Sequence, residues 1–326
     1  MKSVVFEAFG APGEVLKLAE RPLPEPGPGQ VRVKMGLAPI HNHDLAIIMG
    51  TYGYKPALPA VPGTEAMGVV DKLGDGVSHL SVGQRVAGGA SATWAEYYLV
   101  DGKRLVPLPD TVSDETGCQL VSMPLSALML LEDLDIKAGD WVIQNAANGA
   151  VGKVFAQLAP ARGVNVVNLV RRDAGIAELA ALGIGNAVST ETAGWQDRVK
   201  AITSGAPIIR AIDSVAGEAA DQIMETIGQN GVLISFGAMS GKPLVISPAN
   251  LLFKTATVKG FWGAKRSEQT SPAELGRMIG ELVKLAGTGA LKLEIEAAYD
   301  LSNAREAANA SAVPGRKGKI ALRGSR

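Results

Sequence analysis

The chain has 326 residues, 47% of them hydrophobic, and its 32 basic side chains balance its 32 acidic ones. This length can bury the cores of two domains, and a net charge of zero gives no electrostatic reason to expect a nucleic-acid partner or an anionic membrane surface. No apolar run reaches the roughly 18 residues that a membrane-spanning helix needs. The single cysteine, Cys118, excludes an internal disulfide and a cysteine-rich metal lobe. Because residues 3–6 enter a strand pattern without a charged and then apolar leader, we expect a cytoplasmic protein.

The first third of the sequence is rich in short strand patterns that glycine turns separate. Alternation of apolar and charged residues over 31–35 predicts a half-buried strand, and further strands are predicted over 69–73, 84–87 and 94–100. Four prolines within residues 21–30 predict an extended surface connection, because prolines at that density permit neither a helix nor sheet pairing. Together these patterns predict a partly open β-barrel.

From residue 114 onward, helical and strand patterns alternate. Strands are predicted over residues 141–144, 164–170, 187–189, 208–214, 231–236 and 258–262. Helices are predicted over residues 117–131 (interrupted near Pro124), 151–161, 176–182, 195–203, 219–227 and 272–285. Such alternation predicts a doubly wound parallel sheet whose ligand binds at the carboxyl ends of the strands. The strand patterns over 294–302 and 319–322 are expected to rejoin the first domain, so the predicted domains are 1–115 with 290–326, and 116–289.

A small-residue turn between the strand over 141–144 and the following helix predicts a phosphate site. The positions of the Gly-x-Gly-x-x-Gly fingerprint hold Ala147, Gly149 and Gly152, so the first glycine is missing. The unpaired N–H groups and the dipole at the start of the helix favour an anion there. The residues expected to hold a nucleotide at this turn are Asn145, Asn148, Gly149, Ala150, Val151 and Gly152.

Two arginines end the second strand of this unit, about 20 residues past the glycine turn. Proteins that prefer NAD place an Asp or Glu there to bond the ribose 2′-hydroxyl. Arg171 and Arg172 would instead bind a 2′-phosphate through charge-assisted bonds, which predicts NADPH as the cofactor. Two alternatives stay open: the pair could be solvated surface, or Asp173 could neutralise the site or take the acidic role.

Several stretches together resemble the medium-chain dehydrogenase/reductase superfamily along the whole chain. They are Gly-Ala-Pro-Gly-Glu-Val-Leu (10–16), Val-Pro-Gly-Thr-Glu-Ala-Met-Gly-Val-Val (61–70) and Gly-Gln-Arg-Val (83–86). Within the superfamily, residues 50–63, 142–152, 237–239, 251–254 and 260–262 are most similar to the 2-enoyl thioester reductases, and next to the zinc-free quinone reductases. The resemblance implies a Rossmann domain for the nucleotide and a GroES-like barrel for catalysis, with the active site between them.

Zinc is not expected, although many members of the superfamily bind it. A catalytic zinc needs three protein ligands and an open position. Where the zinc enzymes carry Cys-His this sequence has His41-Asn42, and where they carry Gly-His-Glu it has Gly63-Thr64-Glu65. His41 and His43 are interpreted as structural histidines that bond Asp44, and Glu65 as a structural ion-pair residue.

The resemblance implies that a tyrosine takes the place of the metal. Hydride transfer to the β carbon of an unsaturated thioester leaves an enolate, which a tyrosine hydroxyl can stabilise or protonate at the α carbon. The tyrosine in the Gly-x-Tyr segment of the enoyl thioester reductases matches Tyr52, and Tyr54 is the nearby alternative. Asn42 would lie near the nicotinamide. The residues implied to lie along or over the nicotinamide nucleotide are Phe236, Gly237, Ala238, Met239, Phe261 and Trp262.

Three functions stay open at this point. The first is NADPH-dependent reduction of 2-enoyl thioesters, and the second is reduction of quinones. The third is nucleotide binding with little catalysis. The substrate is expected to be a small molecule, whether an enoyl thioester, an enone or a quinone. An acyl-carrier-protein substrate would need a basic patch, for which Arg266, Arg316, Lys317 and Lys319 are candidates. The resemblance also implies a homodimer, joined through the strand over 258–262.

Overall fold

The computed structural model describes residues 1–324 and divides into two compact units. The terminal unit comprises Met1–Ser122 and Ile279–Arg326, and the central unit comprises Met123–Met278. No helix within residues 1–324 is long and apolar enough to cross a membrane. The domain bounds expected from the sequence, 1–115 with 290–326 and 116–289, stay a prediction.

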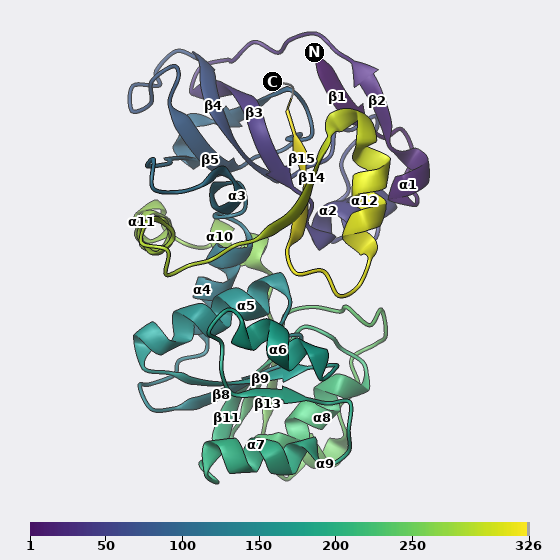
Figure 1. Ribbon diagram of the computed structural model, residues 1–326, viewed down its shortest axis with the longest axis vertical. Coiled ribbons are helices and arrows are strands. Elements are labelled where there is room, and N and C mark those ends of the chain that lie inside the picture. The colour runs from purple at the N-terminus through teal and green to yellow at the C-terminus, as the bar shows by residue number, and fades with distance from the viewer. Residues whose placement is uncertain (325–326) are drawn as a thin grey trace. The chain divides into compact units, whose positions relative to one another are not determined.

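The terminal unit is built on a seven-stranded sheet with the order β14-β15-β3-β4-β5-β7, in which β6 also pairs with β3, and on a two-stranded sheet of β1 and β2 (Figure 1). Its strands are β1 (Lys2–Val5), β2 (Lys17–Glu20), β3 (Gln30–Pro39), β4 (Glu65–Leu73), β5 (Arg85–Gly89), β6 (Tyr97–Asp101), β7 (Leu105–Pro107), β14 (Ile295–Asp300) and β15 (Lys319–Arg323). Its helices are α1 (Pro12–Val15), α2 (Asn42–Met49), α3 (Asp114–Gly117) and α12 (Ala304–Ala312), and α11 (Pro272–Gly287) runs into it. Short 3₁₀ turns lie at Gly102–Arg104 and Leu301–Asn303.

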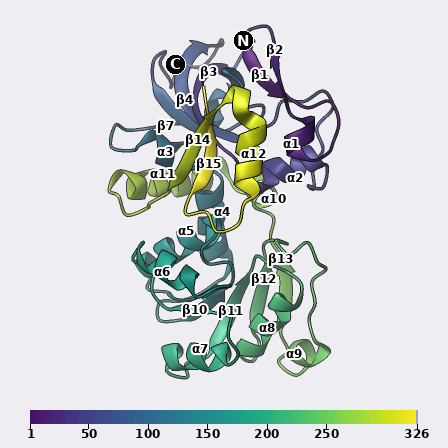
Figure 2. The same cartoon turned by 45° about the vertical axis from the view of Figure 1, so that its right-hand side comes forward.

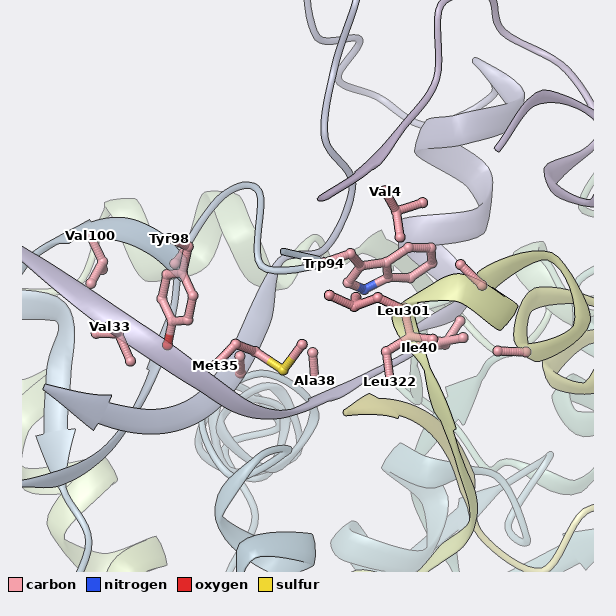
Figure 3. Close-up of a cluster of buried hydrophobic side chains, with 14 of the residues drawn as sticks. Val4, Val33, Met35, Ala38, Ile40, Trp94, Tyr98, Val100, Leu301 and Leu322 are labelled. Atoms are coloured by element: carbon pink, nitrogen blue, oxygen red, sulfur yellow. The ribbon is translucent and has the colours of Figure 1, made fainter. Parts of the chain in front are cut away.

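The alternation in β3 explains the core of the terminal unit. Val31, Val33 and Met35 are buried, and the buried Trp94 lies among Val4, Ile40 and Leu301 (Figure 3). The C-terminal strand β15 pairs antiparallel with β3, which confirms that the tail returns to the first part of the chain.

The central unit holds a six-stranded parallel sheet with the order β10-β9-β8-β11-β12-β13. Its strands are β8 (Trp141–Gln144), β9 (Asn165–Val170), β10 (Ala187–Ser189), β11 (Ile208–Asp213), β12 (Val232–Ser235) and β13 (Thr257–Gly260). Its helices are α4 (Met123–Asp133), α5 (Ala150–Leu158), α6 (Ala174–Ala180), α7 (Trp195–Thr203), α8 (Glu218–Thr226), α9 (Pro248–Leu252) and α10 (Gly263–Glu268), with a 3₁₀ turn at Ala159–Arg162. This confirms the expected doubly wound sheet.

The two faces of this sheet carry different helices. Figures 1 and 2 show α5 and α6 on one face and α7 and α8 on the other. The α7–α8 face packs Ile143, Val167 and Leu169 against Trp195 and Ile223. The strands are apolar toward both faces because helices cover both.

The structure also contains helices that the strand and helix patterns did not predict, chiefly α2 and α12. Helix α2 begins after His41, whose backbone N–H donates to the Asp44 carboxylate at 2.9 Å, and it ends at Gly50 in the left-handed conformation. A histidine is an uncommon residue before a helix, so this start carries little sequence signal. The expected helix over 117–131 is two helices, because the chain breaks between α3 and α4, and Pro124 lies in the first turn of α4 where its missing N–H is tolerated.

Candidate functional site

The predicted nucleotide residues of the central unit all follow the carboxyl ends of parallel strands. Asn145–Gly152 follow β8, Arg171 and Arg172 follow β9, and Phe236–Met239 follow β12, while Phe261 and Trp262 follow β13. Strands β8 and β11 are neighbours at the point where the strand order reverses. Ligands of doubly wound sheets bind outside the carboxyl ends of the strands at this reversal.

The glycine turn after β8 is shaped to bring helix α5 close to the strand. A Cβ added at Gly152 would lie 2.7 Å from both the Ala146 oxygen and the Ala147 Cα, so only glycine fits there. The positive backbone angle in the turn falls on Ala146, with φ of 47°. The buried Ala147 therefore does not need to be glycine, which explains why the missing first glycine is tolerated.

The start of α5 is suited to an anion. The residue before this nine-residue helix, Gly149, has no side chain that could accept a hydrogen bond from the first N–H groups of the helix. Those groups and the helix dipole favour a pyrophosphate. Asn148 is partly buried, and its amide Nδ2 donates to Glu178 Oε2 at 2.9 Å, which ties the turn to α6.

Arg171 and Arg172 are exposed just past the end of β9. Among residues 1–324, no carboxylate forms an ion pair with either guanidinium. Within these residues the neighbouring Asp173 forms an ion pair with neither arginine. Its backbone N–H donates to Glu191 Oε2 at 3.0 Å. The donor set thus fits a 2′-phosphate.

The loops after β12 and β13 contribute aromatic side chains. The rings of Phe236 and Phe261 lie 5.8 Å apart between centroids, and the Phe236 N–H donates to the Asp213 oxygen at 2.7 Å. Ala238, Met239 and Trp262 are exposed. These side chains form an open apolar border at the same edge of the sheet as the glycine turn.

Asn145 has a clear structural contact that its expected role did not include. Its Nδ2 donates to Asp213 Oδ1 at 2.5 Å, and its Oδ1 accepts the Ser214 N–H at 2.7 Å. The fully buried Asp213 also accepts the N–H groups of Val215 and Ala216. Asn145 and Asp213 therefore join the ends of β8 and β11. Sequence reasoning missed Asp213, although a lone carboxylate that ends an apolar strand was a visible signal.

In the terminal unit, Tyr52 lies beside a stack of two imidazoles. The Tyr52 ring lies 5.8 Å from the His43 ring, and the His43 ring is stacked on that of His41 at 4.8 Å. The Tyr52 backbone N–H donates to the Ala46 oxygen at the end of α2 at 3.2 Å. Tyr54 is 58% exposed, and Asn42, the first residue of α2, is also exposed. Tyr52 is therefore held by ring packing and a backbone hydrogen bond, whereas Tyr54 is largely exposed.

Hydrogen bonds fix the tautomer of His43. The Thr64 hydroxyl donates to Asp44 Oδ1 at 2.7 Å, so its oxygen accepts from His43 Nε2, also at 2.7 Å. The proton of a neutral His43 is therefore on Nε2. Burial lowers the pKa of His43, against a smaller opposing effect of Asp44, and keeps the imidazole beside Tyr52 neutral near pH 7. Thr64 was not predicted as a site residue, because its partners lie about 20 positions away in the sequence.

His41 and Glu65 form a fully buried pair. Glu65 Oε2 lies 2.7 Å from His41 Nε2, and Glu65 Oε1 accepts the N–H groups of Val121 at 2.6 Å and Ser122 at 2.9 Å. Burial raises the pKa of Glu65 to about 8, although those N–H groups and Lys319 oppose the shift. Burial also lowers the pKa of His41 well below its usual value. The His41 ring therefore bonds Glu65 and only the His41 backbone bonds the expected Asp44. With these pKa shifts the pair is neutral near pH 7, so the contact of Glu65 is a hydrogen bond and not the expected ion pair.

The same residues do not fit a zinc site. The Nε2 atoms of His41 and His43 are both hydrogen-bonded, and the thiol of the buried Cys118 donates to the Glu115 oxygen. The described part of the chain contains no group of three His, Cys, Asp or Glu side chains that could hold a metal ion.

Three of the four basic residues proposed for a carrier-protein patch, Arg266, Arg316 and Lys319, have local partners or are largely buried. Arg266 Nε donates to Asp133 at 3.0 Å, and Arg316 donates to the oxygens of Val313 and Gly318. Burial lowers the pKa of Lys319 to about 8, against Asp44 and Glu65. These side chains have other partners or are partly buried, so they provide little support for a basic docking patch.

Two family models match the chain. The model described as alcohol dehydrogenase GroES-like domain matches residues 27–110, and the one described as zinc-binding dehydrogenase matches residues 150–279. The chain is 33% identical over 303 residues to the mitochondrial enoyl-[acyl-carrier-protein] reductase of Arabidopsis thaliana, which is 90% of this chain and 80% of that protein. It is 29% identical over 322 residues to the human enzyme of the same name, covering 96% and 86%.

The solved structures with the same fold include quinone oxidoreductases and a 2-enoyl thioester reductase. A quinone oxidoreductase of Escherichia coli complexed with NADPH has a TM-score of 0.89 at 25% identity and covers 99% of this chain and 100% of its own. A quinone oxidoreductase of Pseudomonas syringae has a TM-score of 0.88 at 26% identity, with 99% of both chains covered. A mitochondrial 2-enoyl thioester reductase of Candida tropicalis has a TM-score of 0.87 and covers 99% of both chains, but at 22% identity that likeness concerns the fold alone.

Proposed function

The chain belongs to the medium-chain dehydrogenase/reductase family, and from this premise we propose that it is an NADPH-dependent reductase of 2-enoyl thioesters. Its relatives and structural neighbours are oxidoreductases, and the expected family and enzyme class are confirmed. The observation that carries the choice of substrate is the similarity to enoyl-[acyl-carrier-protein] reductases over about nine-tenths of the chain. Tyr52, at the position that the Gly-x-Tyr segment predicts, supports it.

The cofactor of the proposed reaction is NADPH. The E. coli neighbour is an NADPH complex, and the residues of the central unit fit such a molecule. The start of α5 would hold the pyrophosphate, and Arg171 and Arg172 would hold the 2′-phosphate. Phe236, Phe261 and Trp262 would border the nicotinamide nucleotide. When bound, the cofactor supplies hydride.

The protein's own part in the proposed chemistry is to place a proton donor. Hydride addition at the β carbon leaves negative charge on the thioester oxygen, and a proton must then reach the α carbon. Tyr52 is the proposed donor of that proton. Burial keeps its neighbour His43 neutral, and the hydrogen bond to Thr64 fixes the orientation of that ring.

A substrate comparison tests the proposed function against its runner-up. Reduction of quinones is the alternative, because the structural neighbours from P. syringae and E. coli, at 26% and 25% identity, are named quinone oxidoreductases. We expect NADPH oxidation with crotonyl-CoA to be at least about tenfold faster in kcat/KM than with 1,4-naphthoquinone, a difference of about 1.4 kcal/mol in transition-state binding. Oxidation with the quinone alone would favour the alternative. Tight NADPH binding without turnover of either substrate would indicate a nucleotide-binding protein.

We further propose that the protein is a homodimer joined through the outer edge of β13. Within residues 1–324, β12 is the one strand that pairs with β13, which leaves the other edge of β13 unpaired. Leu252 and Phe253, at the end of α9, are 67% and 78% exposed. An unpaired strand edge near large exposed apolar side chains is a typical place for two copies to associate.

A charge at Phe253 is expected to break this dimer. Phe253→Asp would place a carboxylate in the apolar contact, and light scattering should then report the mass of one chain instead of two. Val82→Asp is the matched control, because Val82 is 65% exposed in the terminal unit and its change should leave the mass unaltered. A wild-type protein that already has the mass of one chain at micromolar concentration would contradict the proposed dimer.

A further inference from the structure

Two amide side chains are buried inside the sheet of the central unit, where apolar residues would be expected. Gln144 is 1% exposed and Asn168 is 2% exposed. They are direct neighbours in the parallel pairing of β8 with β9, so their side chains lie on the same face of the sheet. Ile143, directly before Gln144, and Leu169, directly after Asn168, belong to the apolar cluster on the opposite face.

The two amides form a continuous chain of hydrogen bonds. Gln144 Nε2 donates to the Gly152 oxygen at 2.9 Å and to Asn168 Oδ1 at 2.8 Å. Asn168 Nδ2 donates to the Gly185 oxygen at 2.8 Å. Because backbone oxygens terminate the chain at both ends and accept only, the orientation of both amides is determined. We call this arrangement the amide bridge.

The amide bridge connects the two elements that would bind the two phosphate groups of the cofactor. Gly152 lies in the first turn of α5, whose N–H groups face the pyrophosphate in the proposed site. Asn168 lies on β9, which ends at Val170, directly before Arg171 and Arg172. At its far end the bridge reaches Gly185, in the connection that leads into β10.

We propose that the amide bridge sets the spacing between the start of α5 and the arginines after β9, so that Gln144 and Asn168 are positioning residues for NADPH. This inference rests on the proposed cofactor site. A buried amide pair contributes little net stability compared with apolar residues of similar size, because desolvation offsets most of its hydrogen-bond energy. Unlike apolar packing, the hydrogen bonds of the amide bridge are directional, because each N–H group must point at its acceptor.

The proposal predicts a specific pattern of ligand affinities. NADPH engages both phosphate sites at once, and its affinity depends on their correct separation. The fragment 2′-AMP carries the 2′-phosphate without the pyrophosphate, so it engages the arginines alone. Loosening α5 against β9 should weaken NADPH and spare 2′-AMP.

The experiment measures Kd by calorimetry, together with the melting temperature, for purified full-length variants. In Gln144→Met, whose side chain has similar length but cannot donate, both hydrogen bonds from Gln144 Nε2 are lost. We expect the Kd of NADPH to rise about tenfold, which corresponds to about 1.4 kcal/mol of binding free energy. The Kd of 2′-AMP should change by less than about twofold. Gln196→Met in α7 is the matched control. Gln196 Nε2 donates to the Glu225 carboxylate at the surface, so this replacement should change neither Kd.

A double variant separates positioning from stability. Gln144→Met alone leaves Asn168 Oδ1 buried without a donor, whereas Gln144→Met/Asn168→Leu removes both amides. We expect the double variant to recover part of the melting temperature but none of the NADPH affinity. NADPH affinity that recovers with stability, or a Kd that never changed in Gln144→Met, would overturn the positioning role.

Failure of the cofactor site itself gives a different result. If the arginines do not hold the 2′-phosphate, Arg171→Ala leaves the Kd of 2′-AMP unchanged, and the spacing role of the bridge falls with that site. If Arg171→Ala weakens 2′-AMP while Gln144→Met leaves NADPH unaffected, the site stands and the bridge inference alone is wrong.

Discussion

Tyr52→Phe is expected to lower kcat with crotonyl-CoA by about 10²- to 10⁴-fold, the usual contribution of a positioned proton donor. The phenyl ring keeps the packing against His43, whose centroid lies 5.8 Å from that of Tyr52, and removes only the hydroxyl. The Kd of NADPH should stay within about twofold of the wild-type value, because the proposed nucleotide residues lie on other elements. Steady-state kinetics and a fluorescence titration of NADPH measure the two quantities.

Tyr54→Phe is the control for this experiment. Tyr54 is 58% exposed two positions along the same segment, and the loss of its hydroxyl should leave kcat nearly unchanged. Turnover that survives in Tyr52→Phe but falls in Tyr54→Phe would move the proton donor to Tyr54. Turnover that survives in both variants would remove tyrosine from the proposed mechanism.

Replacing both arginines after β9 is expected to have the second large effect. In Arg171→Ala/Arg172→Ala the Kd of NADPH should rise about 100-fold, because two charge-assisted contacts of about 1.4 kcal/mol each are lost. The Kd of NADH, which has no 2′-phosphate, should change by less than about threefold, so the preference for NADPH should largely disappear. Parallel titrations with the two nucleotides measure it.

A charge control accompanies the arginine variant. Lys200→Ala removes a positive charge from α7, where Lys200 pairs with Asp197 at 3.6 Å, and both affinities should be preserved. If the wild-type protein bound NADH more tightly than NADPH, the assignment of the arginines would be wrong. Asp173 after β9 and Glu191 after β10, which are joined by a hydrogen bond, would then be the residues to test.

Much of the central unit could be predicted because its local patterns and its tertiary structure agree. The strands at 141–144 and 187–189 and the helix at 195–203 have the predicted bounds. Each is a short apolar run or an amphipathic stretch between clear turn residues. The carboxyl ends of these strands then place the predicted nucleotide residues at one edge of the sheet without further information.

The surroundings of Tyr52 could not be predicted in the same way. The residue itself follows from resemblance, but the contacts that order it come from His43, Thr64 and Asp44, brought together from α2 and the segment before β4. The spacing of apolar residues in the sequence gives no sign of a hydrogen bond between residues about 20 positions apart. Helix α2, which carries two of the three, has an unusual histidine at its start and was itself not predicted.

The roles of the buried polar residues of the central unit were also not predicted from the sequence. Asp213, Gln144 and Asn168 each lie in or at the end of an apolar strand, where a single polar residue is easily taken for a solvent-facing position. Their partners are backbone groups and each other across neighbouring strands, so their roles depend on sheet order and register.

In the proposed reaction, hydride goes to the β carbon of an enoyl thioester and a proton goes to its α carbon. The most direct measurement is the reaction of crotonyl-CoA with NADPH deuterated at the transferred position of the nicotinamide, with the product examined by NMR. We expect butyryl-CoA with deuterium at the β carbon and a solvent hydrogen at the α carbon. Recovery of unreacted crotonyl-CoA, or deuterium at any other carbon, would contradict it.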